Sequence, residues 1–205
     1  NGCGRAGQEE TVYQFRHFND SRVAVENLPM INDITNEIMH GLTPEMIAEI
    51  KDASGCKFCF DFAHAICAAN GLGLRHDDVM AGFAALKPDM YHLCDGDING
   101  EDDVHWHYGE GSYDLDKYLA RYIAPDALVT METGGKPAGI QPWINDREYI
   151  RRLQRQVLEK KPSVRKAFFY SAVGAFVFIS EAIIPIKRMP KVMLSEWVAS
   201  MSTPT

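Results

Sequence analysis

The chain alternates short apolar runs with segments whose apolar residues recur at helical spacing. The apolar runs are rich in the β-branched and aromatic residues that favour strands, and they lie at 22–29, 56–65, 89–95 and 126–134. The segments with a period near 3.6 residues, which is typical of helices, lie at 9–18, 43–54, 77–86, 113–123 and 146–160. Four strand–helix units in succession predict an α/β protein with a parallel sheet covered by helices.

One helix start carries clear local signals. Thr43 is a residue type that caps helices, and Pro44 follows at the first helical position, where its missing N–H group costs nothing. Glu45 adds a negative charge to the first turn, where the helix dipole favours it. We therefore expect this helix to begin at Pro44.

Composition and charge narrow the class of protein. With 205 residues, of which 46% are hydrophobic and 24% charged, the chain can bury an ordinary core. The net charge of −7 argues against a broad nucleic-acid surface, because phosphate contacts need an excess of lysine and arginine. The five cysteines follow no secreted disulfide pattern, which indicates reduced cysteines in a cytoplasmic protein.

The sequence starts at Asn1 without a methionine or a signal-peptide pattern, and we expect it to be part of a longer chain.

A titratable side chain lies near the end of each predicted strand. These residues are Glu26, Asp61, His92 and Glu132, and the intervals between them are 35, 31 and 40 residues, about one strand–helix unit each. In a parallel α/β barrel the carboxyl ends of the strands converge on one site. Three carboxylates and one imidazole suit a divalent metal ion such as Mn²⁺, Zn²⁺, Co²⁺ or Mg²⁺. The sequence therefore predicts a metal site at this end of the sheet.

Four motifs together resemble a known family. The segments VAVENLP, CFDFAHA, YHLCDGD with DVHWHYGEG, and VTMETG are similar to the last four strands of the xylose-isomerase-like TIM barrels. This superfamily includes endonuclease IV and the sugar and sugar-phosphate isomerases and epimerases. The resemblance covers roughly residues 9–158 and implies a partial (β/α)8 barrel, so we expect residues 1–160 to form its C-terminal half.

The resemblance also implies roles for individual residues. It implies that Glu26, Asp61, His92 and Glu132 bind a metal. His64 would bind a second metal or the substrate, and Asp103 with His105 would hold a further zinc in the endonuclease. His107 lies two residues further on and could face the same way as His105 in an extended loop, so the match in this loop stays open.

The rest of the same loop is expected to be mainly structural. Gly109 and Gly111 let the backbone turn back toward the next helix, and Glu110 between them is equally compatible with a structural or a functional role. The remaining acids are expected to be solvated, and they are Asp95, Asp97, Glu101 and Asp102.

Three functions fit this pattern. The favoured one is isomerisation or epimerisation of a sugar or sugar phosphate through a cis-enediolate, with Glu26 and Glu132 as acid–base groups. The second is a zinc-dependent apurinic/apyrimidinic endonuclease of the endonuclease IV type, with nucleic acid as its partner. The third is an inactive half-barrel fragment. Its open sheet edges would need covering by the missing half, by a second copy of the chain or by its own tail.

The tail at 161–205 lies outside the resemblance. Its segment 167–186 is almost uniformly apolar and approaches the length of a membrane span. Glu181 and Pro185 fall inside it, and an ionised glutamate is costly in a bilayer. We therefore expect a buried helix or strand that covers the sheet, or an oligomer contact, rather than a membrane anchor.

Overall fold

The computed structural model describes residues 4–32, 34–124, 126–134 and 139–160, and two strands at 176–179 and 182–185. The chain divides into two compact units, Asn1–Val157 and Leu158–Thr205, and each is described by itself.

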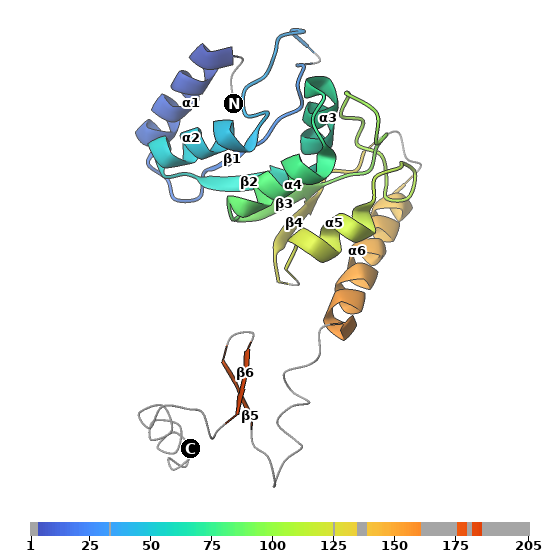
Figure 1. Cartoon of the computed structure of the whole chain (residues 1–205). Coiled ribbons are helices and arrows are strands. Elements are labelled where there is room, and N and C mark those ends of the chain that lie inside the picture. Colours follow the sequence, from blue (N-terminus) through green and yellow to red (C-terminus); the bar gives the residue numbers. More distant parts are fainter. Residues whose placement is uncertain are drawn as a thin grey trace. The chain divides into compact units, whose positions relative to one another are not determined.

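The first unit is built on a four-stranded parallel sheet (Figure 1). Its strands are β1 (Ala24–Glu26), β2 (Lys57–Asp61), β3 (Met90–Leu93) and β4 (Leu128–Met131), and they neighbour one another in chain order. Each strand is joined to the next through one or more helices or loops, as in a barrel of repeating βα units. The predicted α/β class and partial TIM-barrel architecture are confirmed.

Six helices accompany the strands in the described part of the chain. They are α1 (Gly4–Phe18), α2 (Pro44–Ser54), α3 (Phe62–Leu72), α4 (His76–Ala85), α5 (Leu115–Tyr122) and α6 (Gln141–Lys160). Helix α2 begins at Pro44 as predicted, and the Thr43 side chain accepts a hydrogen bond from the Met46 amide. It ends at Gly55, whose left-handed φ of 71° terminates the helix at little steric cost.

The core lies between the sheet and the helices. Strand residues in register, such as Val25 with Phe58 and Phe60 with Tyr91, turn the same face of the sheet toward this core. Helix residues such as Phe83 pack against them, and Phe83 and Phe60 form a ring pair with centroids 5.4 Å apart. Burial of these large apolar side chains is the main force that holds strands and helices together.

The opposite face of the sheet carries the polar residues of the strand ends. Because side chains alternate along a strand, the residues between the core positions point away from the helices. They include Glu26, Asp61 and His92, which the register places in neighbouring strands. Other positions of this face are exposed, such as Lys57 and Leu128, so it is much less covered than the core face.

One predicted strand was wrong in its length. The apolar run 56–65 was expected to be a single strand, but β2 ends at Asp61 and α3 begins at Phe62. The Asp61 carboxylate accepts a hydrogen bond from the His64 amide at 2.8 Å and so caps α3. His64 therefore lies in the first turn of a helix, not on a strand. Helix α6 also begins earlier than the predicted start at 146.

Beyond the end of α6, the second unit is described only in its two strands. β5 (Phe176–Ile179) and β6 (Ala182–Pro185) pair antiparallel, with Val177 opposite Ile184. Both come from the apolar segment for which the sequence left helix and strand open. Within the described residues, no helix is long and apolar enough to cross a membrane. The rest of the predicted tail lies outside the described residues.

Candidate metal centre

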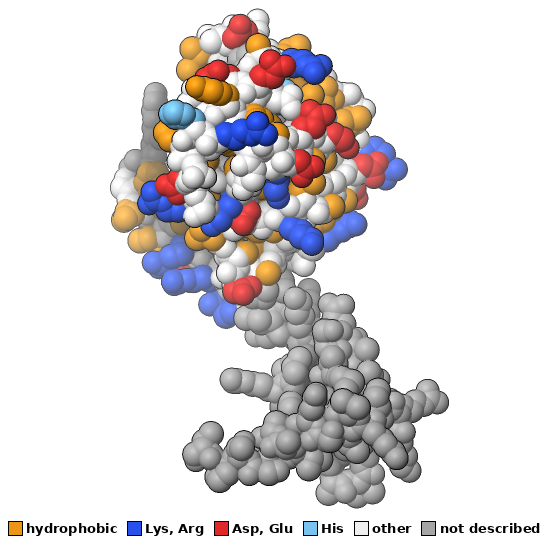
Figure 2. All heavy atoms as spheres, turned by 90° about the vertical axis from the view of Figure 1, so that its left-hand side faces the viewer, with side chains coloured by type: hydrophobic (Ala, Val, Ile, Leu, Met, Phe, Trp, Pro, Cys, Tyr) orange, Lys and Arg blue, Asp and Glu red, His pale blue; other side chains and the backbone are white. Residues whose placement is uncertain are grey.

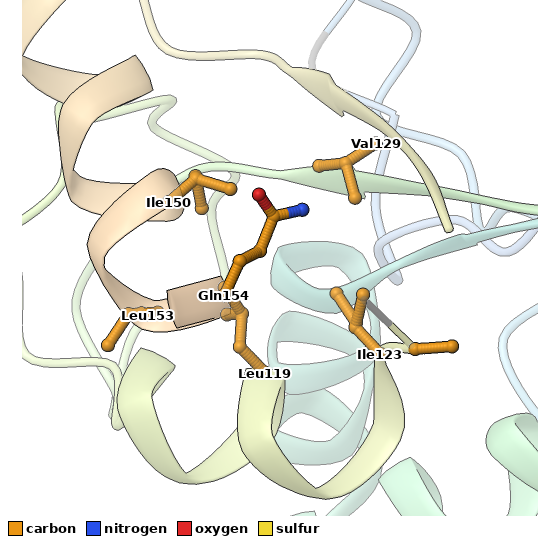
Figure 3. A pocket seen from close by; sticks show the side chains of 7 residues that line it. Leu119, Ile123, Val129, Ile150, Leu153 and Gln154 are labelled. Atoms are coloured by element: carbon orange, nitrogen blue, oxygen red, sulfur yellow. The ribbon is translucent and has the colours of Figure 1, made fainter. Parts of the chain in front are cut away.

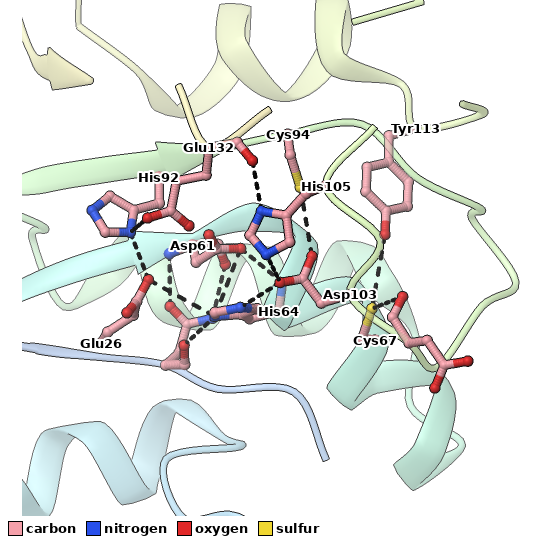
Figure 4. A network of polar contacts seen from close by, with 12 residues as sticks. Glu26, Asp61, His64, Cys67, His92, Cys94, Asp103, His105, Tyr113 and Glu132 are labelled. Atoms are coloured by element: carbon pink, nitrogen blue, oxygen red, sulfur yellow. Dashed lines mark hydrogen bonds and ion pairs between the residues drawn. The ribbon is translucent and has the colours of Figure 1, made fainter. Parts of the chain in front are cut away.

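The structure brings the four predicted metal-binding residues together. Glu26, Asp61, His92 and Glu132 each offer one ligand atom, and these atoms all lie within 4.8 Å of one another (Figure 4). A cation bound at about 2.1 Å from oxygen and nitrogen ligands separates neighbouring ligands by about 3 Å and opposite ligands by about 4 Å. The four groups thus lie within about 1 Å of the spacing that one ion requires.

His92 is the centre of this group. Its Nδ1 atom lies 2.7 Å from Glu26 Oε1 and 2.9 Å from Glu132 Oε1, so carboxylates from the two outer strands meet at one nitrogen. Hydrogen bonding to the Cys59 thiol and to these two carboxylates raises the pKa of His92 to about 12. The same ion pair lowers the pKa of Glu132. The protonated His92 therefore keeps the two carboxylates close together, and a metal cation could take the place of this proton.

Asp61 supports the fit to a metal ion most directly. Burial raises its pKa to about 6, since a charged carboxylate loses its hydration there. Its Oδ1 atom accepts the His64 amide, whereas its buried Oδ2 atom has no hydrogen-bond partner among the described residues. A buried carboxylate oxygen without a donor is costly unless a cation neutralises it. Together with the mixed oxygen and nitrogen donors, this oxygen fits a divalent metal ion.

Asn27 shapes the site, although the sequence did not single it out. Its side chain is fully buried, and its Oδ1 atom accepts the Asp61 amide at 2.8 Å. Its Nδ2 group donates to the Asp61 carbonyl oxygen at 2.8 Å, and its own carbonyl lies 2.8 Å from Nδ1 of His64. Asn27 directly follows Glu26, so it ties the end of β1 to the end of β2. Its place after a strand-end carboxylate was the only signal in the sequence.

Asp103 forms the centre of a second polar group. Its Oδ2 atom lies 2.9 Å from Nε2 of His64 and 2.7 Å from Nε2 of His105 (Figure 4). The Cys94 thiol donates to its Oδ1 atom. The structure thus brings together the three residues for which the resemblance implies a second metal or a substrate contact.

The charged side chains around Asp103 shift one another's pKa values. Burial opposes protonation of His64, but the Asp61 and Asp103 carboxylates outweigh it and raise the pKa of His64 to about 10. The hydrogen bond to Asp103 raises the pKa of His105 to about 9. Burial opposes ionisation of Asp103, yet the two imidazoles lower its pKa well below the ordinary value. When no metal is bound, Asp103 therefore stabilises the protonated forms of both imidazoles, and Asp61 adds to this effect at His64.

The two groups are linked through the backbone at Glu132. Nδ1 of His105 lies 2.6 Å from the Glu132 carbonyl oxygen, and the Gly134 amide donates to the His105 carbonyl at 2.7 Å. His105 adopts a left-handed φ of 50°, which is uncommon for a residue with a side chain. The loop after β3 is thus held against the end of β4.

His107 points away from Asp103. Its Nδ1 atom lies 2.6 Å from Oδ2 of Asp146 on α6, so His105, and not His107, pairs with Asp103. This contact settles which histidine of the loop faces the second group.

Asp95 was wrongly expected to be a solvated acid. It is 2% exposed, and its carboxylate accepts the amides of Gly96, Gly109, Gly111 and Tyr113 at 2.8–3.2 Å. A Cβ atom on Gly111 would collide with Gly96 and Asp95, which explains the second glycine of the Gly-Glu-Gly sequence. The other three loop acids, Asp97, Glu101 and Asp102, are exposed as expected.

An apolar hollow lies apart from these polar groups (Figure 3). It is formed where α5, α6 and β4 meet, and its lining residues are Leu119, Ile123, Ala124, Val129, Ile150, Leu153 and Gln154. None of them is charged or shared with the polar groups, so the hollow offers no group for metal or proton chemistry.

No protein-family model matches the sequence, and no curated protein matches it either. Solved structures similar to this chain include the following two. A D-tagatose 3-epimerase-like protein matches with a TM-score of 0.53 and 21% identity, over 74% of this chain and 53% of its own. The protein TTHB071 from Thermus thermophilus, in a structure soaked with ZnCl₂, matches with a TM-score of 0.48 and 21% identity, over 76% of this chain and 59% of its own. The chain thus spans a little over half the length of these proteins. The first likeness shows that the chain has the fold of part of a D-tagatose 3-epimerase-like protein, which agrees with the predicted partial α/β barrel.

Proposed function

We propose that the protein is a divalent-metal-dependent isomerase or epimerase that acts on a sugar or a sugar phosphate. Glu26, Asp61, His92 and Glu132 would hold Mn²⁺, Zn²⁺, Co²⁺ or Mg²⁺. The observation that carries the proposal is the approach of Glu26 and Glu132, from the two outer strands, to the same nitrogen of His92 at 2.7 and 2.9 Å. Two carboxylates that approach the same site from different strands suit proton transfer on two sides of a bound substrate.

The chemistry needs an acid and a base beside a polarised carbonyl. A bound divalent cation supplies positive charge that polarises the carbonyl and makes the neighbouring C–H bond more acidic. One of the two carboxylates, Glu26 or Glu132, takes this proton and leaves a cis-enediolate. The other group, in its protonated carboxylic acid form, donates a proton to the opposite face of the same carbon, which inverts that carbon. The group that takes the proton must be ionised, and the lowered pKa of Glu132 suits that residue to the role of the base.

The group around Asp103 would act on the rest of the substrate. Its two imidazoles, His64 and His105, meet one carboxylate oxygen at 2.9 and 2.7 Å. They would orient a substrate hydroxyl or, together with Asp103, hold a second metal ion.

That same group favours a second candidate function. Several metal ions could activate water for cleavage of a phosphodiester at an abasic site, and His64, Asp103 and His105 are extra ligands that a single-metal epimerase does not require. Such an enzyme also needs a basic surface to hold DNA. The chain carries a net charge of −7, which argues against a broad basic surface, and on the one face shown in Figure 2 acidic and basic side chains lie interspersed. We therefore place the small-molecule reaction first.

Metal analysis and two assays separate these functions. The full-length protein, purified without chelator, would be analysed for bound metal and then tested on a panel of ketoses and their phosphates and on a duplex with one abasic site. We expect turnover of a ketose with one ion per chain, and its loss in the Glu132→Gln variant. Cleavage of the duplex by a form with several zinc ions would overturn this proposal in favour of the nuclease. No bound metal and no turnover would indicate an inactive half-barrel.

A further inference from the structure

Asp146 is a buried carboxylate on α6 to which the sequence motifs assign nothing. It is 2% exposed, and three donors contact it. Nδ1 of His107 lies 2.6 Å from its Oδ2 atom, and the Thr133 hydroxyl donates to the same oxygen. The Tyr108 amide donates to Oδ1 at 3.0 Å. A carboxylate held by three donors has little freedom to move.

These donors come from the two segments that carry candidate site residues. Thr133 directly follows Glu132 at the end of β4, and His107 lies two residues after His105 in the loop that follows β3. Asp146 therefore bonds to both segments at once. Trp143, one turn earlier on α6, adds a bond from its indole Nε1 to the Thr133 carbonyl at 2.9 Å. Both the hydroxyl and the carbonyl of Thr133 are thus held by α6.

The same two segments also bond directly to each other near the site. Nδ1 of His105 lies 2.6 Å from the Glu132 carbonyl, and the Gly134 amide donates to the His105 carbonyl. These bonds form only while the two segments stay side by side. The orientation of the His105 ring and the position of Glu132 therefore depend on what holds the segments together.

We propose that Asp146 and His107 form a positioning pair that sets where Glu132 and His105 stand in the site. The pair acts through Thr133 and the backbone of the loop. Neither Asp146 nor His107 bonds directly to the side chain of Glu132 or His105. Residues that orient metal ligands typically affect metal affinity or activity 10- to 100-fold when they are replaced. The effect on affinity rests on the proposed metal site, whereas the effect on the His105 ring does not.

Metal titration of the full chain tests the pair. Mn²⁺ or Zn²⁺ would be titrated calorimetrically into wild type and variants, well below each variant's melting temperature, so that only folded protein is compared. We expect Asp146→Asn and His107→Leu to bind metal about 10- to 100-fold more weakly. His107→Asn should recover most of the affinity, since its side-chain amide can donate to Asp146 in place of Nδ1. The matched control is Phe83→Leu, which loosens the core on the helix side and should lower the melting temperature without changing the affinity.

A second measurement keeps the test independent of the metal. Nitrogen-15 spectra of the histidine rings in chelator-treated protein report the hydrogen bonding of His105. We expect Asp146→Asn to shift the His105 signals and Phe83→Leu to leave them unchanged. Unchanged His105 signals in Asp146→Asn, or wild-type metal affinity in that variant, would overturn the positioning role. Wild-type protein that binds no metal while the His105 signals shift would instead count against the proposed function alone.

Discussion

The side chain of Asn27 pairs with the backbone of Asp61 in both directions. Its Oδ1 atom accepts the Asp61 amide and its Nδ2 group donates to the Asp61 carbonyl, each at 2.8 Å. The side chain thus replaces a peptide group at the point where β1 and β2 end. Glu26 and Asp61, two of the candidate metal ligands, are fixed relative to each other by this contact.

Replacing Asn27 by leucine should destabilise the protein. The change keeps a similar volume but leaves the amide and the carbonyl of Asp61 buried without partners, and each such group costs about 1–3 kcal/mol. We expect the free energy of unfolding, measured in urea, to fall by about 3 kcal/mol. Asn99→Ala is the matched control, because Asn99 is exposed and its loss should change stability by less than about 0.5 kcal/mol. Equal stability of the two variants would show that the pairing is not important.

Replacing Glu132 by glutamine should weaken metal binding and remove one proton-transfer group. Glutamine keeps the shape but carries no negative charge for the cation or for His92. Loss of a general base typically slows such a reaction about 10²- to 10⁴-fold. The measurement is exchange of the substrate α-proton with deuterated water, followed by NMR. Glu110→Gln is the control, since Glu110 is exposed in the same region and its side chain accepts a hydrogen bond from the His107 amide, which a glutamine oxygen can also accept. An exchange rate unaffected by Glu132→Gln would remove Glu132 from the reaction.

The stability of the metal-free protein should fall as the pH rises above neutrality. The pKa of His64 is about 10 in the folded protein and 6.5 as its ordinary value, so the folded state binds the proton more tightly. The contribution of His64 to the free energy of unfolding is full below pH 6.5 and declines above that value. It is lost as the pH passes about 10. The slope from one such group is at most about 1.4 kcal/mol per pH unit. Urea unfolding of chelator-treated protein at several pH values should show this decline, and His64→Asn should reduce it. Parallel curves for the two proteins would contradict the assignment to His64.

Replacing Gly111 by alanine should disturb the loop that follows β3. The added methyl group would run into the Gly96 backbone and the Asp95 carboxylate, whose bonds to four amides shape the loop. Overpacking of this kind costs about 1–3 kcal/mol. Thermal unfolding should therefore show a lower melting temperature for Gly111→Ala, whereas Glu110→Ala at the exposed neighbouring position should change little. A melting temperature equal to that of wild type would mean that the loop can open to admit the methyl group.

Much of the scaffold could be predicted from local patterns. The apolar runs predicted four strands because alternating or continuous apolar side chains suit a sheet that is buried on one face. Thr43 and Pro44 predicted a helix start because capping depends only on neighbouring residues. The polar groups at the strand ends, Glu26, Asp61, His92 and Glu132, meet because parallel strands in chain order end at the same edge.

Other features depended on contacts between residues far apart in the chain. The sequence by itself determined the class of fold and the four residues at the strand ends, since these follow from spacing along the chain. Only the tertiary structure decided that Asp95 is buried, that His107 pairs with Asp146 and that Asn27 joins β1 to β2. The physical reason is that a buried polar group must find a partner, and nothing in the residues beside Asp95, His107 or Asn27 identifies that partner before the chain has folded.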